Sequence, residues 1–319
     1  MESQHPSSPA VGEFSRWRRP DGQLPIVGQI FPAPLKLKVP EIIFLFWVVK
    51  ILTTAGGEVT SDYLKKYGNF GGGGIEVALF VSALVLQFTT RRYRALAYWS
   101  LAYAIAIAGT GLSDFLHLDV HLSYLVDSLL WAVILTVVFW AWYRSEGTLS
   151  IHSVSTQRRE AFYWATVFAT FALGTAVGDF TAATLGMGYL VSGFFFLGVI
   201  LIPAIGWRWF GLNSIVAFWF AYIVTRPLGA SFSDWISKPA YLTGLNFGNG
   251  RTAIIFGVVT FVFVVYLAVA KPDVAGAPSD EAVAQPDARA DNSPGAEPRS
   301  HPPLPDVDYT SGALEAEPE

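Results

Sequence analysis

Four segments of the chain share one pattern, and the first of them, Phe46–Tyr63, reads FWVVKILTTAGGEVTSDY. The other three align with it without gaps: YWSLAYAIAIAGTGLSDF (Tyr98–Phe115), YWATVFATFALGTAVGDF (Tyr163–Phe180) and FWFAYIVTRPLGASFSDW (Phe218–Trp235). Each copy keeps a Trp, a Gly ten residues later and an Asp five residues after that Gly. Such internal self-similarity indicates an array of one structural unit.

The composition places this unit in a membrane. Of the 319 residues, 52% are hydrophobic and only 14% are charged, whereas about 25% are charged in soluble domains. Apolar runs of membrane-spanning length are predicted at 40–62, 73–90, 95–116, 122–143, 160–182, 187–207, 212–236 and 251–270. We therefore predict an all-α integral membrane protein with eight transmembrane helices. They are expected to form four parallel two-helix repeats, at about 40–92, 93–144, 158–208 and 212–270.

The basic residues orient these spans. They cluster before the first span and after the second, fourth, sixth and eighth, so the positive-inside rule places both termini in the cytoplasm. Residues 1–39 are expected to form a basic, Pro-rich cytoplasmic segment, and residues 271–319 a disordered acidic cytoplasmic tail. No cleavable signal peptide is visible. The GGGG run at 71–74 is predicted to be a flexible link before the second span.

Two stretches of the repeat resemble a known family. Lys38–Asp62 (KVPEIIFLFWVVKILTTAGGEVTSD) and the hairpin Gly178–Leu190 (GDFTAATLGMGYL) are similar to bacterial multipass proteins described as uncharacterised membrane-anchored proteins, which are built from a repeat of unknown function. The resemblance covers about residues 38–270. It implies the fold and a location in the bacterial cytoplasmic (inner) membrane, and it brings no catalytic residue or substrate.

The Trp and Gly residues of the repeat have structural explanations. Tryptophan is enriched at membrane interfaces, so we interpret the four repeat Trp as interfacial anchors, with ligand stacking as the alternative: Trp47, Trp99, Trp164 and Trp219. Each repeat Gly is followed four residues later by Ser or Gly, and this small-xxx-small spacing lets helices pack closely. The predicted helix-packing positions are Gly57, Gly109, Gly174 and Gly229.

The Asp residues of the repeat favour a functional interpretation. Parallel repeats around one axis would set them at one level near the periplasmic side: Asp62, Asp114, Asp179 and Asp234. Rings of acidic side chains concentrate cations, and Glu58 adds a carboxylate one turn before Asp62. The alternative is that each Asp caps the following turn or hydrogen-bonds backbone groups that are freed at the end of its span.

Two cations lie deeper within the predicted spans. Lys50 stands twelve residues before Asp62, and Arg226 stands eight residues before Asp234. A cation buried in a membrane needs a counter-charge, and Glu58 or Asp127 could provide it. The pairs are either structural or form a gate or proton-coupling pair along a cation pathway.

The stretch Ser113–His121 (SDFLHLDVH) contains a second candidate site. His117, Asp119 and His121 have no counterparts in the other copies, and with Asp114 they offer nitrogen and oxygen ligands for zinc or manganese. Alternate residues converge only if the chain is extended there, so a solvated polar loop is the competing interpretation.

These features lead to three functional hypotheses. The first is a transporter or channel for a small cation, possibly a divalent metal; the second is a non-transporting membrane sensor, interaction or scaffold protein; the third is a membrane-embedded enzyme. The chain has no cysteine, P-loop, H-E-x-x-H or G-x-S-x-G motif. We therefore expect no enzyme, no catalytic residue and no certain cofactor beyond a possible divalent metal ion. The expected partners are the lipid bilayer, a small cation as substrate and possibly a second copy of the chain, with no nucleic acid.

Overall fold

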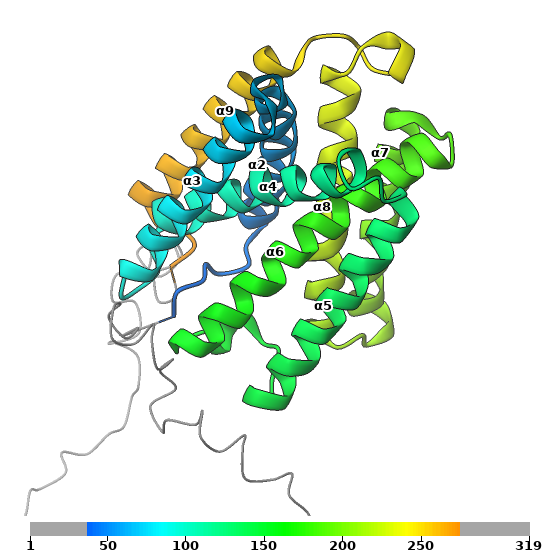
Figure 1. Ribbon diagram of the computed structural model, residues 1–319. Helices are drawn as coiled ribbons and strands as arrows, with labels where there is room; N and C mark the ends of the chain where they lie inside the picture. Colours follow the sequence, from blue (N-terminus) through cyan, green and yellow to red (C-terminus); the bar gives the residue numbers. More distant parts are fainter. Residues whose placement is uncertain (1–36, 275–319) are drawn as a thin grey trace, which may run out of the picture. The chain divides into compact units, whose positions relative to one another are not determined.

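The computed structural model describes residues 37–274, and within that range it contains eight long α-helices and no β-strand (Figure 1). The helices are α2 (Phe44–Leu64), α3 (Gly68–Thr89), α4 (Ala95–Leu118), α5 (Tyr124–Glu146), α6 (Gln157–Asp179), α7 (Gly188–Phe210), α8 (Ser214–Ser237) and α9 (Asn249–Ala270). Short helical turns connect them: η2 (Lys65–Tyr67), η3 (Ile151–Ser153), η4 (Phe180–Thr184) and η5 (Ala240–Leu242). The prediction of an all-α fold is confirmed.

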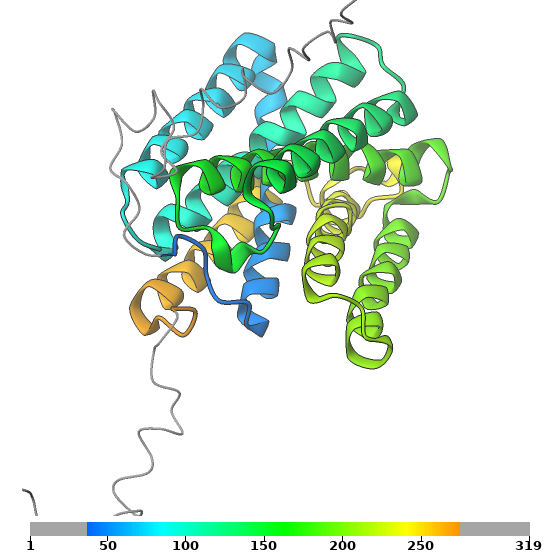
Figure 2. The ribbon, with the colours of Figure 1, turned by 90° about the horizontal axis from the view of Figure 1, so that it is seen from below.

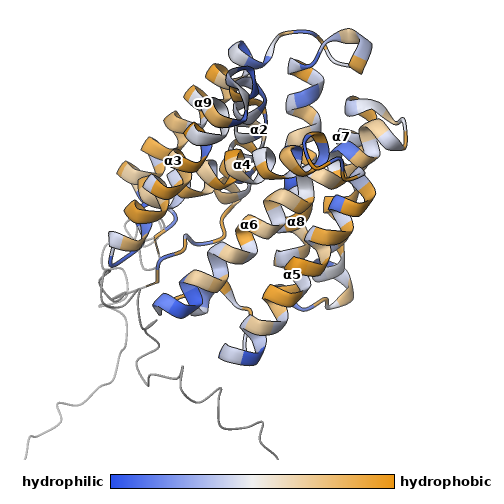
Figure 3. Cartoon of the chain, in the orientation of Figure 1, coloured by the Kyte–Doolittle hydropathy of each residue, from blue (hydrophilic) through white to orange (hydrophobic). Residues whose placement is uncertain are grey.

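Seven helical stretches are long and apolar enough to cross a membrane. The first of these, Phe44–Thr89, has 46 residues and contains α2, η2 and α3. Figure 3 shows that α3 and α9 are hydrophobic along most of their length. The GGGG run at 71–74 lies inside α3 rather than in a flexible link, because the helix already begins at Gly68. The chain is therefore a membrane protein with several spans.

Local sequence signals explain where several helices begin and end. Ser123, Thr156 and Asn213 precede α5, α6 and α8, and each side chain accepts a hydrogen bond from a backbone N–H of the first turn. Gly68 separates η2 from the rest of α3 with a φ of +71°, and Gly147 ends α5 in the left-handed conformation. Glycine adopts this conformation at low cost because it lacks a Cβ.

The helices form an inner and an outer set. The inner helices pack in a closed order: α2 on α4, α4 on α6, α6 on α8 and α8 on α2. Each outer helix packs on the inner helix of the next hairpin: α3 on α4, α5 on α6, α7 on α8 and α9 on α2. Figure 2 shows α9 beside the start of α2, and α7 beside α8. Of the span residues, 61–67% are buried in α4, α6 and α8, against 17–28% in α5, α7 and α9.

The repeat glycines lie where neighbouring inner helices touch. A Cβ on each glycine would meet the next inner helix at one residue: Ala106 for Gly57, Phe171 for Gly109, Arg226 for Gly174 and Thr54 for Gly229. Each contacted residue stands three positions before the glycine of its own copy. The same crossing therefore occurs four times, and small residues there let the backbones approach closely. These crossings close the inner helices around one polar interior.

The ends of the described chain are packed against the helices. Lys38 and Asp273 are 1% and 2% exposed. The Glu41 N–H donates to the Asp273 carbonyl at 2.9 Å, and the Tyr93 N–H donates to the Leu37 carbonyl at 3.0 Å. Folded structure therefore extends to Leu37 at one end and beyond Lys271 at the other, past both predicted domain limits. The predicted features of residues 1–36 and 275–319 lie outside the described residues.

Candidate functional site

The interior of the inner helices contains a buried ion pair. Arg226, from α8, is 0% exposed, and its Nη2 donates to the Glu58 Oε2 of α2 at 2.6 Å. The Arg226 Nη1 donates to the Thr54 carbonyl at 3.3 Å, and Nη2 also donates to the Thr175 hydroxyl at 2.7 Å and to the Thr110 hydroxyl. A buried charge requires such a partner because desolvation costs several kcal/mol. Of the two counter-charges predicted for Arg226, the structure brings Glu58 to it.

The threonines complete what we term the central cluster, defined as Arg226, Glu58, Thr110 and Thr175. The Thr110 hydroxyl donates to the Glu58 Oε2 at 2.9 Å, and the Thr175 hydroxyl donates to the same oxygen at 3.3 Å. Glu58, Thr110 and Thr175 occupy the position directly after the repeat Gly in the first three copies. One residue from each inner helix therefore contributes to a single hydrogen-bonded group.

The repeat aspartates lie one helical turn beyond the central cluster. The Lys65 Nζ bridges two of them, at 2.5 Å from the Asp62 Oδ1 and 2.7 Å from the Asp114 Oδ2. The Lys238 Nζ donates to the Asp62 Oδ2 and lies 3.8 Å from the Asp234 Oδ1. Burial alone would lower the pKa of Lys238, but Asp234 and Asp62 raise it well above its usual value. We call these two lysines and the four repeat aspartates the aspartate layer.

Asp179 is the member of the aspartate layer without a lysine partner. It is half-buried, and no ion pair or hydrogen bond joins its side chain to another described residue. The charged groups that act on it include Asp114, Glu58 and Lys238. Glu76, from α3, adds a further buried carboxylate near the layer, and its Oε1 accepts a hydrogen bond from the Ser61 hydroxyl at 2.7 Å. The sequence prediction did not include Glu76.

Lys50 is the second deep cation predicted from the sequence, and no carboxylate reaches it. Its side chain is 1% exposed, and its Nζ has no hydrogen-bond partner. The Nζ lies 3.9 Å from the ring centre of Phe171 and 4.2 Å from that of Tyr222. Aromatic faces attract cations electrostatically. We call this site the lysine pocket.

Asp127 lies elsewhere and does not balance either deep cation. It is buried on α5, and its Oδ2 accepts a hydrogen bond from the Ser113 hydroxyl at 2.5 Å. Ser61 and Ser113 occupy the same repeat position, directly before the Asp. Each of them thus holds an acidic side chain from the outer helix of its own hairpin, Glu76 in the first and Asp127 in the second.

The metal ligands predicted in SDFLHLDVH do not converge. The His117 ring stacks on Tyr124 with 3.7 Å between ring centres, and its Nδ1 is 2.8 Å from the Leu122 carbonyl. Asp119 instead accepts a hydrogen bond from the Asn69 amide at 2.6 Å, and Asp114 is bound to Lys65. His121 is exposed in the left-handed conformation, with a φ of 61°. Among residues 37–274, no three His, Cys, Asp or Glu side chains are grouped to hold a metal ion.

Three of the four repeat tryptophans lie inside the protein rather than at its lipid-facing surface. Trp99, Trp164 and Trp219 are 1–4% exposed and belong to the main hydrophobic cluster. The Trp219 Nε1 donates to the Leu149 carbonyl at 2.9 Å. They are buried because aromatic residues such as Tyr98 and Tyr163 pack against them. Burial in this cluster, rather than an exposed position at a membrane interface, is what the structure shows for these three.

A further buried ion pair lies near the ends of the described chain. The Lys38 Nζ donates to the Glu160 Oε2 at 2.7 Å, and the Gln87 amide donates to the Glu160 Oε1 at 2.9 Å. Burial lowers the pKa of Lys38, although the charge of Glu160 opposes that shift. The pair attaches the segment before α2 to the start of α6. The sequence prediction missed it because Lys38 and Glu160 are far apart in the chain.

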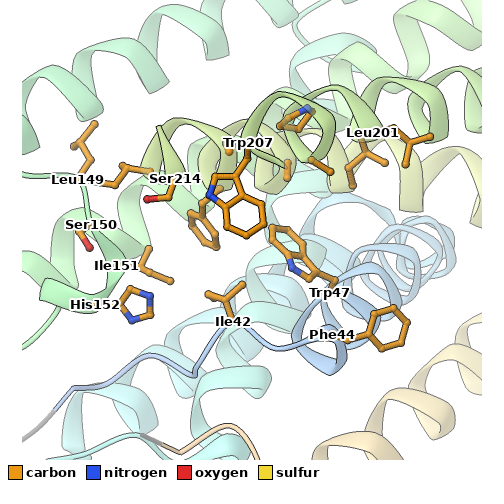
Figure 4. A pocket seen from close by; sticks show the side chains of 17 residues that line it. Ile42, Phe44, Trp47, Leu149, Ser150, Ile151, His152, Leu201, Trp207 and Ser214 are labelled. Carbon is orange, nitrogen blue, oxygen red and sulfur yellow. The ribbon is translucent and has the colours of Figure 1, made fainter. Parts of the chain in front are cut away.

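An apolar groove of about 770 Å³ opens beside the start of α2 (Figure 4). Trp47, Phe44 and Ile42 line one side, and Trp207 of α7 lines another. None of the described residues that line it is Asp, Glu, Lys or Arg. Its lining therefore shares no residue with the central cluster or the aspartate layer. Trp47, the fourth repeat tryptophan, is partly buried here.

The helices and their repeated crossings define a multipass membrane protein built from helical hairpins. Three segments of the chain, 97–148, 162–212 and 217–272, match a family described as a Repeat of Unknown Function (DUF347), and the chain belongs to this repeat family. The matched segments overlap the second, third and fourth predicted repeats, so the resemblance to an uncharacterised repeat family is confirmed over residues 97–272; the first predicted repeat is not among the matched segments. No curated protein and no solved structure matches the chain.

Proposed function

We propose that this protein transports a small cation across a membrane through the interior of its inner helices. The aspartate layer is the cation-binding site, and the central cluster is the barrier behind it. The observation that carries this proposal is the charge of the aspartate layer. Four carboxylates and two ammonium groups carry a formal charge of −2 (−4 + 2) at one end of the four inner helices.

The charge and the ligand type favour a hard cation. Carboxylate oxygens suit Mg²⁺, Ca²⁺ and Mn²⁺, and two net negative charges match one divalent ion. In this structure, Lys65 and Lys238 form ion pairs with the carboxylates of Asp62, Asp114 and Asp234. A cation would therefore bind by displacing the lysines, with Asp179 as its first contact. The cation is a substrate in this account, and we propose neither a resident cofactor nor a catalytic residue.

The central cluster supplies the barrier to ion movement. Its four side chains are 0–3% exposed and are joined to one another by hydrogen bonds. A cation can pass only if Arg226 and Glu58 separate. Pro227 follows Arg226 inside α8, and proline removes a hydrogen bond from the helix. This weakened turn is where we expect α8 to bend when the pair opens.

We also propose the membrane topology that transport requires. Phe44–Thr89 would extend for about 69 Å as one helix, more than twice the roughly 30 Å of a hydrocarbon core, so α2 and α3 are proposed as two spans. Eight spans then form four parallel hairpins around one axis, with both termini in the cytoplasm of a bacterium and the aspartate layer on the periplasmic side of the inner membrane. The distribution of basic residues and the four equivalent glycine crossings support this topology.

Transport by purified protein tests the proposal. The full chain is reconstituted in liposomes, and entry of Mn²⁺, Mg²⁺, Ca²⁺, Na⁺ and K⁺ is measured in turn with ion-sensitive dyes. We expect at least one of these ions to enter. Asp179→Asn is expected to reduce that entry at least tenfold, because it removes the free carboxylate without stranding a lysine.

Asp119→Asn is the matched control for this experiment. It makes the same chemical change at an exposed aspartate outside the aspartate layer, and we expect wild-type entry. The proposal fails if none of the five ions enters wild-type liposomes, or if Asp179→Asn transports as well as the wild type.

A further inference from the structure

Lys50 is a buried charged group to which the proposed cation pathway gives no role, and no carboxylate of residues 37–274 pairs with it. We propose that it carries a proton in exchange for the transported cation, so that the protein is a cation–proton antiporter. This inference rests on the proposed cation transport and adds the ion to which it is coupled.

The first argument is the surroundings of the Lys50 side chain. A permanent charge at such depth is expected to have a carboxylate partner, yet the Nζ makes no hydrogen bond. Lysine, unlike arginine, can lose its proton when it is buried. The rings of Phe171 and Tyr222 stabilise the charged form, whereas loss of water favours the neutral form. The lysine pocket can therefore hold both protonation states, as a proton carrier requires.

The second argument is the balance of charge around the pocket. Arg226 lies over the same Phe171 ring, with its guanidinium carbon 5.3 Å from the ring centre. Glu58 is already bonded to Arg226, so a protonated Lys50 adds an unbalanced positive charge to the interior. A cation that enters from the aspartate layer brings further positive charge toward Lys50. Coulomb repulsion at low dielectric is strong, so cation entry favours release of the Lys50 proton.

The third argument is a group of buried tyrosine hydroxyls on the other side of the pocket. Tyr222, which contacts Lys50, is buried with Tyr98 of α4 and Tyr163 of α6, and the hydroxyls of Tyr98 and Tyr163 are hydrogen-bonded to each other. In the aligned copies, Tyr98 and Tyr163 occupy the position four residues before the one that Lys50 and Tyr222 share. Their hydroxyls offer sites for proton transfer away from the central cluster.

Helix α9, which also packs on α2, brings no competing group. The titratable side chains of α9 are Arg251 and Tyr266, and both are exposed. The exchange itself is a simple protonation. Nζ gains a proton on one side of the membrane and releases it on the other, and the electron pair of the broken N–H bond stays on nitrogen. No redox partner or further reactant is required.

Proton movement is measured in liposomes that contain the full-length protein and a pH-sensitive dye. A gradient of Mn²⁺, Mg²⁺, Ca²⁺, Na⁺ or K⁺ is imposed in turn. We expect cation entry into wild-type liposomes to raise the internal pH. Lys50→Met should reduce this pH change at least tenfold. Lys66→Met, which changes an exposed lysine, should behave as the wild type.

A binding measurement keeps the test valid if Lys50→Met blocks transport altogether. Addition of the transported cation to folded protein in weakly buffered detergent solution should release about one proton per cation from the wild type and none from Lys50→Met. Equal proton release from both proteins overturns the inference. Cation entry into wild-type liposomes without a pH change overturns it while cation transport stands. If no cation enters, the proposed transport fails, and the coupling fails with it.

Discussion

The central cluster and the aspartate layer lie one helical turn apart on the same four helices, yet only one of them keeps the repeat. All four copies have an aspartate in the layer. One turn earlier the copies have Glu58, Thr110, Thr175 and Ala230, and Arg226 enters from a position that is Thr, Ala or Phe elsewhere. The comparison indicates that the repeated residues build the closed arrangement of the four inner helices. The residues that differ between the copies determine the charges and hydrogen bonds in its interior.

The two levels also differ in their access to solvent. The side chains of Lys65 and Lys238 in the aspartate layer are 35% and 19% exposed, whereas Arg226 in the central cluster is 0% exposed. The carboxylates that these lysines contact are 2–11% exposed, but the lysine side chains reach solvent, so they can leave for solution at less cost than Arg226. A buried pair is strongly destabilised when one partner is removed. The layer is therefore suited to binding and the cluster to closure.

The largest effect is expected from removing the cation of the central cluster. Arg226→Met strands the Glu58 carboxylate and should lower the free energy of unfolding by about 3–5 kcal/mol. Adding Glu58→Gln to the same chain should recover much of this loss, because the stranded charge disappears. Thermal unfolding in detergent measures both variants, with Arg208→Met, at an exposed arginine, as the control. A stable single variant would show that the pair does not hold the cluster together.

The next effect concerns the packing of the four inner helices at the repeat glycines. Gly57→Ala places a methyl group against Ala106 of α4, and such overpacking costs about 1–3 kcal/mol. Gly73→Ala lies in α3 with open space around it, and alanine favours a helix over glycine by roughly 1 kcal/mol. The two variants should therefore change the unfolding temperature in opposite directions. Equal shifts would argue against close packing at the repeat glycine.

A comparable effect, independent of pH, is expected in the aspartate layer. Lys238→Met removes charged hydrogen bonds worth about 1.5–3 kcal/mol, while Lys65 still neutralises Asp62. Because the folded-state pKa of Lys238 is raised, its contribution is complete below the unfolded pKa of about 10.4 and is lost only as pH rises through the folded value. The destabilisation should be the same at pH 6 and pH 9, with Lys66→Met as control. A difference that vanishes by pH 9 would contradict the assignment.

The smallest effect is expected in the SDFLHLDVH segment. His121→Asn retains a residue that tolerates the left-handed conformation and should change stability by less than about 0.5 kcal/mol. Any stabilisation of the wild type by Mn²⁺ or Zn²⁺ in a melting experiment should persist in this variant. Its loss in His121→Asn, rather than in Asp179→Asn, would place a metal site in this segment after all.

Much of the fold could be predicted from the sequence because the four copies make equivalent contacts at their glycines. The Trp–Gly–Asp pattern marks the four inner helices, and the small residue four positions after each Gly identifies their packing. The tryptophans were less predictable, because the same residue suits a membrane interface and an aromatic core. The GGGG run was also misjudged, because α3 begins at Gly68 and continues through it despite the low helix propensity of glycine.

The candidate site was predictable only in part. Arg226, Glu58 and the repeat aspartates are visible as charges in apolar runs, but their partners depend on the fold. Lys65 and Lys238 could have been found, because they follow Asp62 and Asp234 by three and four residues, a spacing that brings helical side chains together. Glu76 has no comparable partner within its own helix, and only the packing of α3 brings it to Ser61.

The solvent access of the two levels tests the comparison most directly. The chain has no cysteine, so Asp179→Cys and Thr175→Cys each introduce a single thiol, one helical turn apart on α6. A membrane-impermeant thiol reagent is applied to oriented vesicles from the side of the aspartate layer. We predict that the thiol at position 179 reacts quickly and is protected by the transported cation, whereas the thiol at position 175 stays unmodified. Equal reaction at both positions, or at neither, would contradict an open aspartate layer above a sealed central cluster.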